Sequence, residues 1–547
     1  MAIEKTGILV DTSTSFTNPS RFEEAGKVST ISASNLTPNT RYYVKGYVIQ
    51  DGTTIYSNNI QNFYTDDTNI DYFTLSNATN TTNYIELSSE GSVDPITLEY
   101  SKDGDNWTSW TYSSGSVLAL SLESGEHISF RGNNQHFSQD VYRYTHIDVS
   151  ASTGHEGTDK YYYFSSSGDI AASGNIMTLV DKSGRSTTIP STACFARLFK
   201  GIGSHLLSAP DLPAVTLTIA CYYQMFSGTS ISSAPVLPAT VMKNHAYSGM
   251  FSSCLNLLTP PALPASSLSR ECYYDMFMGS GITSSPNLPA LSVPICAYAG
   301  IFAACRNLTN VGSISATSVT GEGGMSGMFR GCTSLRTAPN INVTTINANS
   351  ACFLLFDGCT SLETPPPTLG GQTITGNNAF SLAFQGCTSL RTAPVLPATQ
   401  IGPAAYSSMF YGCTSLRTAP DLPATSIGIR CYQSMFENSG ITSAPSILPA
   451  MILKANCYSS MFAGTNITKA PVLPAQDISV TSCYNNLFYG CSSLNEVKVY
   501  AQNWSTANTS NWLQNVSATG DFYNLGRTTI PTGVSGIPSG WTEYNSL

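Results

Sequence analysis

Charged residues are scarce in this chain of 547 residues, because Asp, Glu, Lys and Arg make up only 11% of the sequence. Soluble domains usually carry about 25%, so the surface is expected to be neutral and rich in hydroxyl groups. The 25 basic residues are outnumbered by 34 acidic ones and form no run. A basic patch of the kind that binds a phosphate backbone is therefore excluded, and no nucleic-acid partner is expected.

Long apolar runs are missing too. No segment approaches the roughly 20 apolar residues that a membrane-spanning helix needs, so the sequence predicts no membrane insertion. Residues 1–10 lack the apolar stretch of a secretory signal. If the protein acts outside its cell, we expect either that a signal segment is missing from this sequence or that the protein leaves within a virus particle.

Motifs that mark enzymes and cofactor sites are also absent. The six histidines form no His-Glu-x-x-His pair, and no Gly-x-Ser-x-Gly nucleophile elbow occurs. The glycine clusters at 201–203 and 321–324 lack the strand-to-helix context of a phosphate loop. No carboxylate pair recurs. The sequence therefore predicts a non-enzymatic protein with no catalytic residue, no metal site and no cofactor.

What the sequence does contain is an internal repeat, in which a phenylalanine recurs every 25 to 28 residues. A fixed period of this length is typical of a solenoid, because each unit can bury its apolar side only against its neighbours. About 12 repeats are expected. The recurring residues, called anchor phenylalanines below, are Phe199, Phe226, Phe251, Phe277, Phe302, Phe329, Phe356, Phe384, Phe410, Phe436, Phe462 and Phe488.

Each copy predicts one short helix and one short strand. In the copy of Phe436, apolar side chains at Cys431, Met435 and Phe436 are spaced i, i+4 and i+5, which is one stripe of a helix. A Gly-Cys-Thr-Ser-Leu turn follows the anchor in four copies. The prolines of the next segment, such as 416–423, exclude a helix and suit a short, edge-like strand.

All fifteen cysteines lie in the repeats, either three residues after an anchor phenylalanine or four to six residues before it. One interpretation is a ladder of metal sites or disulfides. The other is that cysteine acts as a small, buried apolar residue stacked along the solenoid. The odd total favours the second interpretation, as does the fact that only three copies carry both positions.

The residue order in one copy is Leu-x-x-Ala-Pro-x-Leu-Pro, then Ile or Leu, then Cys-Tyr-x-x-Met-Phe-x-Gly-Cys-Thr-Ser-Leu. Over about 300 residues, this order resembles the Treponema-type, or BspA-like, leucine-rich repeats of gut and oral bacteria and of the phages that infect them. The resemblance implies a curved leucine-rich-repeat solenoid and a role in adhesion to surfaces or partner proteins. It implies no particular ligand.

The N-terminal flank predicts β modules. The run from Leu36 to Tyr42 and the alternation up to Ile49 resemble the second half of a fibronectin type III sandwich, with its first two strands missing. Because a half sandwich exposes an apolar face and a strand edge, we expect a neighbouring chain to complete it. Alternating strands between residues 67 and 190 predict a second β-sandwich. Its segment 101–107 is interpreted as an Asp-Gly hairpin, with a likeness to the Asp box of sialidases as the alternative.

The repeat period stops after Tyr500, and an aromatic cluster follows among glycines and prolines. A cap on the open end of the solenoid is expected, because the last repeat would otherwise expose its core. A carbohydrate-stacking platform is the alternative. The chain is thus predicted to be multidomain, with all-β sandwich modules at 1–66 and 67–190, a leucine-rich-repeat solenoid at 191–500 and a C-terminal cap at 501–547.

The candidate ligand face lies on the strand side of the repeats. Arg336, Glu363, Arg391 and Arg417 follow the turn leucine in successive copies, and Asp421 lies beyond the first proline. Spaced about one strand apart, such residues can bind an extended polar ligand. A solvated ladder, with Glu363 between arginines, is the other interpretation.

These patterns together predict a structural or adhesion protein, and most simply a tail-fibre-like or head-fibre-like component of a bacteriophage virion. Residues 1–66 are expected to dock to other virion proteins, and the solenoid is expected to bind a host cell-surface protein or glycan. A bacterial cell-surface adhesin is one alternative, and a carbohydrate-binding accessory module is another. The sequence leaves open whether the chain forms a homo-oligomer.

Overall fold

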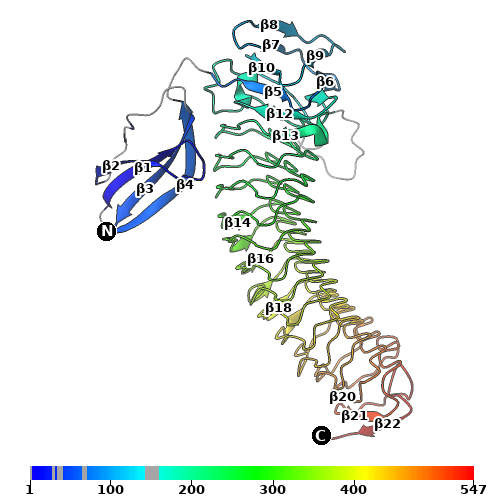
Figure 1. Cartoon of the computed structure of the whole chain (residues 1–547). Helices are drawn as coiled ribbons and strands as arrows, with labels where there is room; N and C mark the ends of the chain where they lie inside the picture. Colours follow the sequence, from blue (N-terminus) through cyan, green and yellow to red (C-terminus); the bar gives the residue numbers. More distant parts are fainter. Residues whose placement is uncertain (1–2, 27–30, 32, 34–40, 65–69, 142–158) are drawn as a thin grey trace. The chain divides into compact units, whose positions relative to one another are not determined.

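The computed structural model describes residues 3–26, 31, 33, 41–64, 70–141 and 159–547 (Figure 1). These residues form an almost entirely β protein with 22 strands, five sheets and two short 3-10 turns. The predicted all-β character of the N-terminal modules is confirmed. Two compact units are present, one of residues 1–246 with 260–267 and one of residues 247–259 with 268–547.

The N-terminal sheet is antiparallel, with the strand order β2-β1-β3-β4. Asp51 and Gly52 join β3 to β4 and both have positive φ, as the two-residue turn that matches strand twist requires. The predicted alternating segment is therefore a strand, whereas 36–40 lies outside the described residues. The strands are β1 (Ile3–Asp11), β2 (Ser20–Ala25), β3 (Arg41–Gln50) and β4 (Thr53–Tyr64).

Tyr47 organises one face of this sheet. Its ring lies over Gly7 of the neighbouring strand, where any Cβ would overlap the ring. Its hydroxyl donates to Glu23 at 2.8 Å, and the Arg21 guanidinium lies 5.0 Å from the ring centroid. Burial, aided by Glu23, raises the pKa of Tyr47 to about 12. Side chains of the sheet itself thus cover this face.

The second module is a pair of packed sheets, with the strand orders β13-β12-β5-β10-β7-β8 and β11-β6-β9. Phe73 and Phe130 of the larger sheet pack against Phe164 of the smaller one, with centroid distances of 5.7 and 5.3 Å. The elements are β5 (Phe73–Asn77), β6 (Asn83–Glu90), β7 (Thr97–Ser101), β8 (Thr108–Thr111), β9 (Leu118–Leu122), β10 (His127–Gly132), β11 (Tyr161–Ser166), β12 (Ile170–Ser173), η1 (Ile176–Leu179), η2 (Gly203–His205) and β13 (Leu206–Ser208).

The larger sheet continues directly into the first repeat. β13 belongs to the copy of Phe199 and pairs in parallel with β12, where Ile170 aligns with Leu206. Phe199 in turn stacks between Phe164 and Phe226, with centroid distances of 6.5 and 5.4 Å. The sandwich therefore covers the apolar end of the first repeat, as a cap would.

The predicted helix of each repeat is wrong, because the described copies have a run of tight turns in its place. The backbone N–H groups of this run alternate between two acceptors. One N–H group donates to a carbonyl of the next copy, and the following one donates to the carbonyl three residues back in its own copy. In the copy of Phe410, Tyr406 donates to the Cys431 carbonyl at 2.9 Å, while Ser407 donates to Ala404 at 3.1 Å. An α-helix needs every N–H group to bond within its own segment, which this arrangement prevents.

Left-handed backbone conformations set these turns. In the eleven copies from Phe226 to Phe488, the residues six and two positions before the anchor and two positions after it have φ between 47° and 75°. A residue in this region at every fourth position interrupts an α-helix. Glycine fills the third position in eight copies, because it adopts positive φ without a steric penalty.

The strands of the repeats are shorter than predicted and lie at other residues. Six two-residue strands form a parallel sheet in which the second residue is buried. The predicted strand segment 416–423 contributes one isolated bridge, between Thr418 and Ser443, since its prolines lack N–H donors. The six strands are β14 (Ser292–Val293), β15 (Ser318–Val319), β16 (Thr345–Ile346), β17 (Thr373–Ile374), β18 (Gln400–Ile401) and β19 (Ser426–Ile427).

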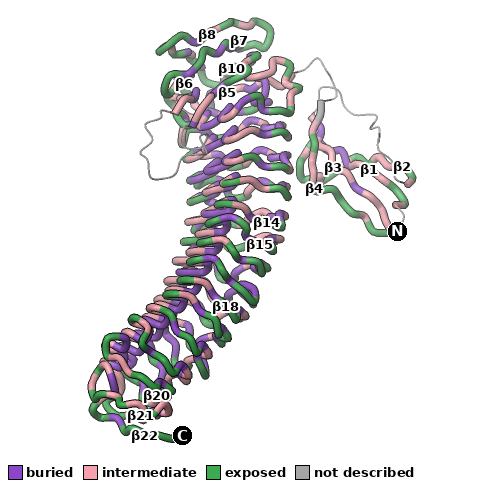
Figure 2. The backbone as a smooth tube through the Cα atoms, turned by 180° about the vertical axis from the view of Figure 1, so that it is seen from behind, coloured by how far each residue is buried: buried purple, intermediate pink, exposed green. Residues whose placement is uncertain are grey.

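Stacked rings form the core of the second unit. The anchor phenylalanines from Phe251 to Phe488 make one column, with successive centroids 5.3 to 5.9 Å apart and ring planes within 23° of parallel. Tyr432 and Tyr458 belong to a second column and are 5.7 Å apart. Figure 2 shows buried segments recurring in every turn of the stack. Each copy therefore buries its apolar side against its neighbours.

The cysteines after the anchor cap backbone carbonyls. The Cys359 thiol donates to the Phe329 carbonyl of the preceding copy at 3.0 Å. In a copy with a shorter turn, Thr465 occupies the position of the cysteine, and its hydroxyl donates to the Phe462 carbonyl of its own copy at 2.8 Å. All fifteen cysteines are free and fourteen are buried, and burial raises the pKa of the Cys359 thiol to about 12. The structure thus favours stacked, buried residues over a disulfide ladder.

The turn ladder extends beyond Tyr500, where the sequence period stops, because Phe488 donates to the Trp512 carbonyl at 2.9 Å. Trp512 is fully buried, and its indole N–H donates to the Gly536 carbonyl at 2.9 Å. Trp541 is 8% exposed. Burial of these rings suits a cap rather than a stacking platform. The final parallel sheet consists of β20 (Glu496–Val499), β21 (Gly520–Asn524) and β22 (Trp541–Tyr544).

Candidate functional site

The candidate ligand residues belong to the second unit, and three of them form a chain of ion pairs. Arg336 Nη1 lies 2.8 Å from Glu363 Oε1, and Arg391 Nη2 lies 3.5 Å from Glu363 Oε2. The two arginine side chains are 76% and 73% exposed. Exposed pairs of this kind contribute only about 0–1 kcal/mol to stability. They are therefore available to exchange partners with a ligand.

Arg417 is held differently from the other arginines. Its Nη1 donates to the Gly440 carbonyl at 2.8 Å and to the Thr414 carbonyl at 3.0 Å. This geometry exists because the copy of Phe436 has the shorter turn, which brings the Gly440 carbonyl within reach. Asp421 is exposed on the same turn as Arg417. Arg336, Glu363, Arg391 and Arg417 thus lie on four successive turns, with Asp421 on the last of them, and these five residues are called the charged row below.

A second, uncharged row was missed by sequence reasoning. It consists of the first residues of β14 to β19, which point away from the buried Val or Ile that follows. Parallel pairing places neighbours about 4.8 Å apart. The signal was a polar residue before Val or Ile in each of these six copies. The residues of this hydroxyl row are Ser292, Ser318, Thr345, Thr373, Gln400 and Ser426.

The hairpin between β7 and β8 is closed by its own hydrogen bonds. The Asp103 carboxylate accepts from the Asn106 side chain at 2.7 Å and from the Asp105 backbone N–H at 2.9 Å. The Asn106 side chain, with further donors of the loop, holds the pKa of Asp103 well below its usual range. The Trp107 indole donates to the Gly104 carbonyl at 2.9 Å. These bonds are those of a self-contained Asp-Gly hairpin.

Among the carboxyl groups described in the repeats, that of Asp275 has a strongly raised pKa. Its side chain lies over Gly300 of the next copy, where a Cβ would overlap a carboxylate oxygen. Burial raises the pKa of the Asp275 carboxyl from 3.8 to about 6. The folded state therefore binds this proton more tightly than the unfolded state. The stability that the protonated group provides is complete below pH 3.8 and is lost as the pH rises through about 6.

We expect Asp275→Asn to raise the free energy of unfolding at pH 8 by about 1–3 kcal/mol, since the amide mimics the protonated acid. The lower end allows for the partial exposure of the carboxyl. Near pH 4 the variant and the parent should melt at similar temperatures. Thermal unfolding between pH 4 and 8 measures this difference. The exposed Asp421→Asn serves as control, and an equal stabilisation by it would contradict a specific effect of Asp275.

In the described part of the chain, no group of three or more His, Cys, Asp or Glu side chains could hold a metal ion. No helix of that part is long and apolar enough to cross a bilayer. His146 and His155 lie outside the described residues, while His205 Nδ1 lies 2.7 Å from Asp169 in an exposed pair.

No protein-family model matches this chain, and no curated protein sequence matches it. The likeness of the repeats to the BspA-like family therefore stays a prediction from the residue order. The charged row and the hydroxyl row are the features on which a function can be argued.

Proposed function

We propose that this chain is a non-enzymatic adhesion protein of a bacteriophage virion. A leucine-rich-repeat solenoid of BspA-like type contacts the host surface, and residues 1–66 dock to other virion proteins. The observation that carries the proposal is that exposed polar residues recur in successive copies about one strand spacing apart, both in the charged row and in the hydroxyl row.

Such rows suit an extended surface ligand, because a polymer offers the same groups again at regular intervals. Each contact is weak, since exposed ion pairs and hydroxyl groups gain little over their contacts with water. Several contacts along one ligand add through effective concentration. The stacked rings beneath hold the rows in register, so little ordering is needed on binding.

The N-terminal sheet supports a docking role for the other end of the chain. By strand register Ile8, Phe22 and Val48 share the face opposite Tyr47. Ile55 in the neighbouring strand is 52% exposed. In the described residues β2 and β4 each pair on one side only, and a free strand edge can accept a further strand. A virion protein that adds a strand at one of these edges would cover that edge and the apolar face beside it.

Adhesion is tested with beads that carry the full chain, mixed with a panel of intact gut bacteria. We expect the beads to adhere to at least one strain. The triple variant Arg336→Glu, Arg391→Glu and Arg417→Glu should lower the adhering fraction about tenfold, because reversing three charges opposes the same ligand. Adhesion is counted by flow cytometry.

The matched control reverses three exposed cations outside the charged row, Arg306→Glu, Arg430→Glu and Lys454→Glu. Equal loss with both triple variants, or adhesion to no strain, would count against a binding role for the row. The virion setting has a separate test, in which antibodies to residues 191–500 are applied to purified phage particles. Labelling of bacterial envelopes without labelling of particles would support a bacterial adhesin instead.

A further inference from the structure

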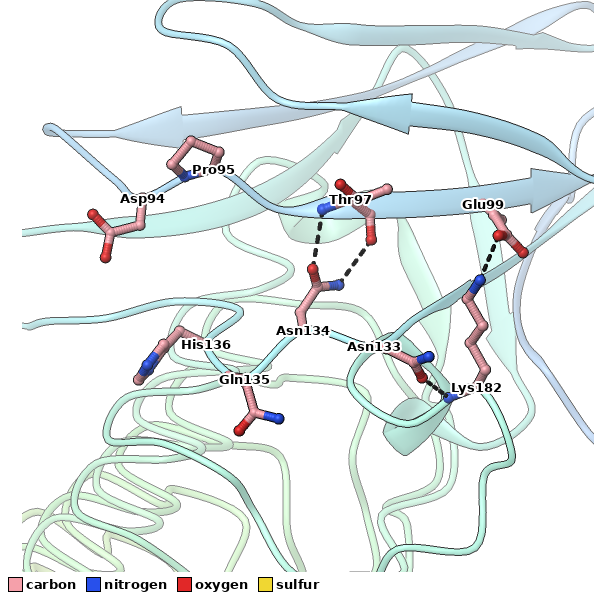
Figure 3. A pocket seen from close by; sticks show the side chains of 9 residues that line it. All are labelled: Asp94, Pro95, Thr97, Glu99, Asn133, Asn134, Gln135, His136 and Lys182. Atoms are coloured by element: carbon pink, nitrogen blue, oxygen red, sulfur yellow. Dashed lines mark hydrogen bonds and ion pairs between the residues drawn. The ribbon is translucent and has the colours of Figure 1, made fainter.

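A polar pocket of about 360 Å³ lies in the sandwich module, between the start of β7 and the loop that follows β10 (Figure 3). Figure 3 shows the Asp94 side chain and the His136 ring at one end of the pocket, on opposite walls. Lys182 and Glu99 form an ion pair at the other end. The pocket is lined by side chains that sequence reasoning did not single out.

Hydrogen bonds hold the two walls in place before any ligand arrives. The Asn134 side chain accepts from the Thr97 backbone N–H and donates to the Thr97 carbonyl, both at 3.0 Å. On the strand wall, the buried Tyr162 hydroxyl donates to the Asp94 carbonyl at 2.6 Å. The backbone on both sides of the opening is therefore fixed, which lowers the entropic cost of binding.

The groups that face the opening are unengaged. The side chains of Asp94, Gln135 and His136 form no hydrogen bond or ion pair with any described residue. Asp94 and His136 are exposed. Their carboxylate, amide and imidazole groups supply both acceptors and donors. The opening thus offers hydrogen bonds that the protein itself does not use.

A second cavity continues the pocket on the far side of the same pair. It has a volume of about 570 Å³, and both Asp94 and His136 line it, together with Lys160, Thr192 and other polar residues. The two cavities thus share the Asp94 and His136 side chains in their linings, and together they are called the groove below. All of these residues belong to the first compact unit.

The charge balance of the groove selects the kind of ligand. Three carboxylates, of Asp94, Glu99 and Asp140, line it along with the ammonium groups of Lys160 and Lys182, so both signs are present in nearly equal number and neither a polyanion nor a polycation is favoured. An uncharged ligand with many hydroxyl groups can use every free donor and acceptor. Because two cavities adjoin, we expect a ligand of more than one ring to fill them.

We propose that this groove binds a neutral oligosaccharide, with the Asp94 carboxylate accepting hydrogen bonds from adjacent sugar hydroxyls and His136 contacting the same or the next ring. The site is separate from the charged row and does not depend on it. Because the walls offer few apolar groups for stacking, each site binds weakly, and multivalent presentation provides useful affinity.

Saturation-transfer NMR on the full chain tests this with maltotriose, cellotriose, chitotriose and lactose as probes, and with 3′-sialyllactose as an anionic comparison. We expect at least one neutral probe to receive saturation and to bind at millimolar concentration. Asp94→Asn and His136→Ala should each weaken that binding about tenfold. Both side chains are exposed, so neither change should alter the melting temperature.

The matched controls are Glu86→Gln and His127→Ala, which alter an exposed carboxylate and an exposed imidazole of the same module outside the groove. These controls should bind as the parent does. The proposal is overturned if no neutral probe receives saturation, if the sialylated probe binds best, or if the controls lose as much binding as the groove variants. None of these outcomes bears on adhesion through the charged row.

Discussion

Phe410→Ala is expected to lower the free energy of unfolding of the repeat stack by about 3–5 kcal/mol. Phe410 is fully buried, and its ring stacks between those of Phe384 and Phe436, with centroid distances of 5.4 and 5.6 Å. Truncation removes the buried ring, breaks two ring contacts and leaves a cavity. The backbone cannot collapse into this cavity, because hydrogen bonds to both neighbouring copies hold it in register.

Urea unfolding followed by circular dichroism measures this loss. Tyr489→Ala is the matched control, since it truncates an aromatic side chain that is 40% exposed and should cost well under about 1 kcal/mol. Phe410→Leu keeps an apolar side chain, so its loss in the free energy of unfolding should lie between those of Phe410→Ala and Tyr489→Ala. A loss below about 1 kcal/mol for Phe410→Ala would contradict a continuous ring column.

Gly440→Ala is expected to cost about 3 kcal/mol, although it adds a single methyl group. A Cβ at this position would overlap the Thr414 carbonyl of the preceding copy and crowd the Arg417 guanidinium. Either the two copies must separate locally, which weakens the bond from the Gly440 N–H to the Cys413 carbonyl, or the turn must shift. Arg417 then loses its anchor on the Gly440 carbonyl.

Gly412→Ala provides the comparison that isolates this overlap. A Cβ at Gly412 meets no atom within 4 Å, but the residue has a φ of 71°, so alanine there should cost about 1 kcal/mol of backbone strain. Both variants are compared by thermal unfolding. If Gly412→Ala proves as harmful as Gly440→Ala, then close approach of the copies is not what requires glycine at 440.

The period and the buried positions could be predicted from the sequence, but the local backbone could not. Apolar residues at Cys431, Met435 and Phe436 fit a helix, yet turns that repeat every four residues place the same side chains inwards. The copy of Phe329 held the deciding signal, because Gly323, Gly327 and Gly331 occupy its three left-handed positions. Other copies place residues such as Leu354 there, whose types give no hint of positive φ.

The candidate ligand face was only partly predictable. The alternation of Arg336, Glu363 and Arg391 was read from the repeat register, and the structure pairs Glu363 with both arginines. The sugar-site residues Asp94 and His136 are far apart in the sequence and belong to no repeat. They line the same pocket, whose two walls are joined by the hydrogen bonds between Asn134 and Thr97, and no local sequence pattern predicts this tertiary contact.

The alternating hydrogen bonds of the turns bear on how such a chain can change length over generations. Each copy presents to the next the same set of donors that it receives from the one before. A duplicated copy would therefore find matching partners on both sides and would leave no mismatched junction. Recombination between neighbouring copies in a gene can thus lengthen or shorten the molecule in whole units, and its reach can evolve without redesign of its ends.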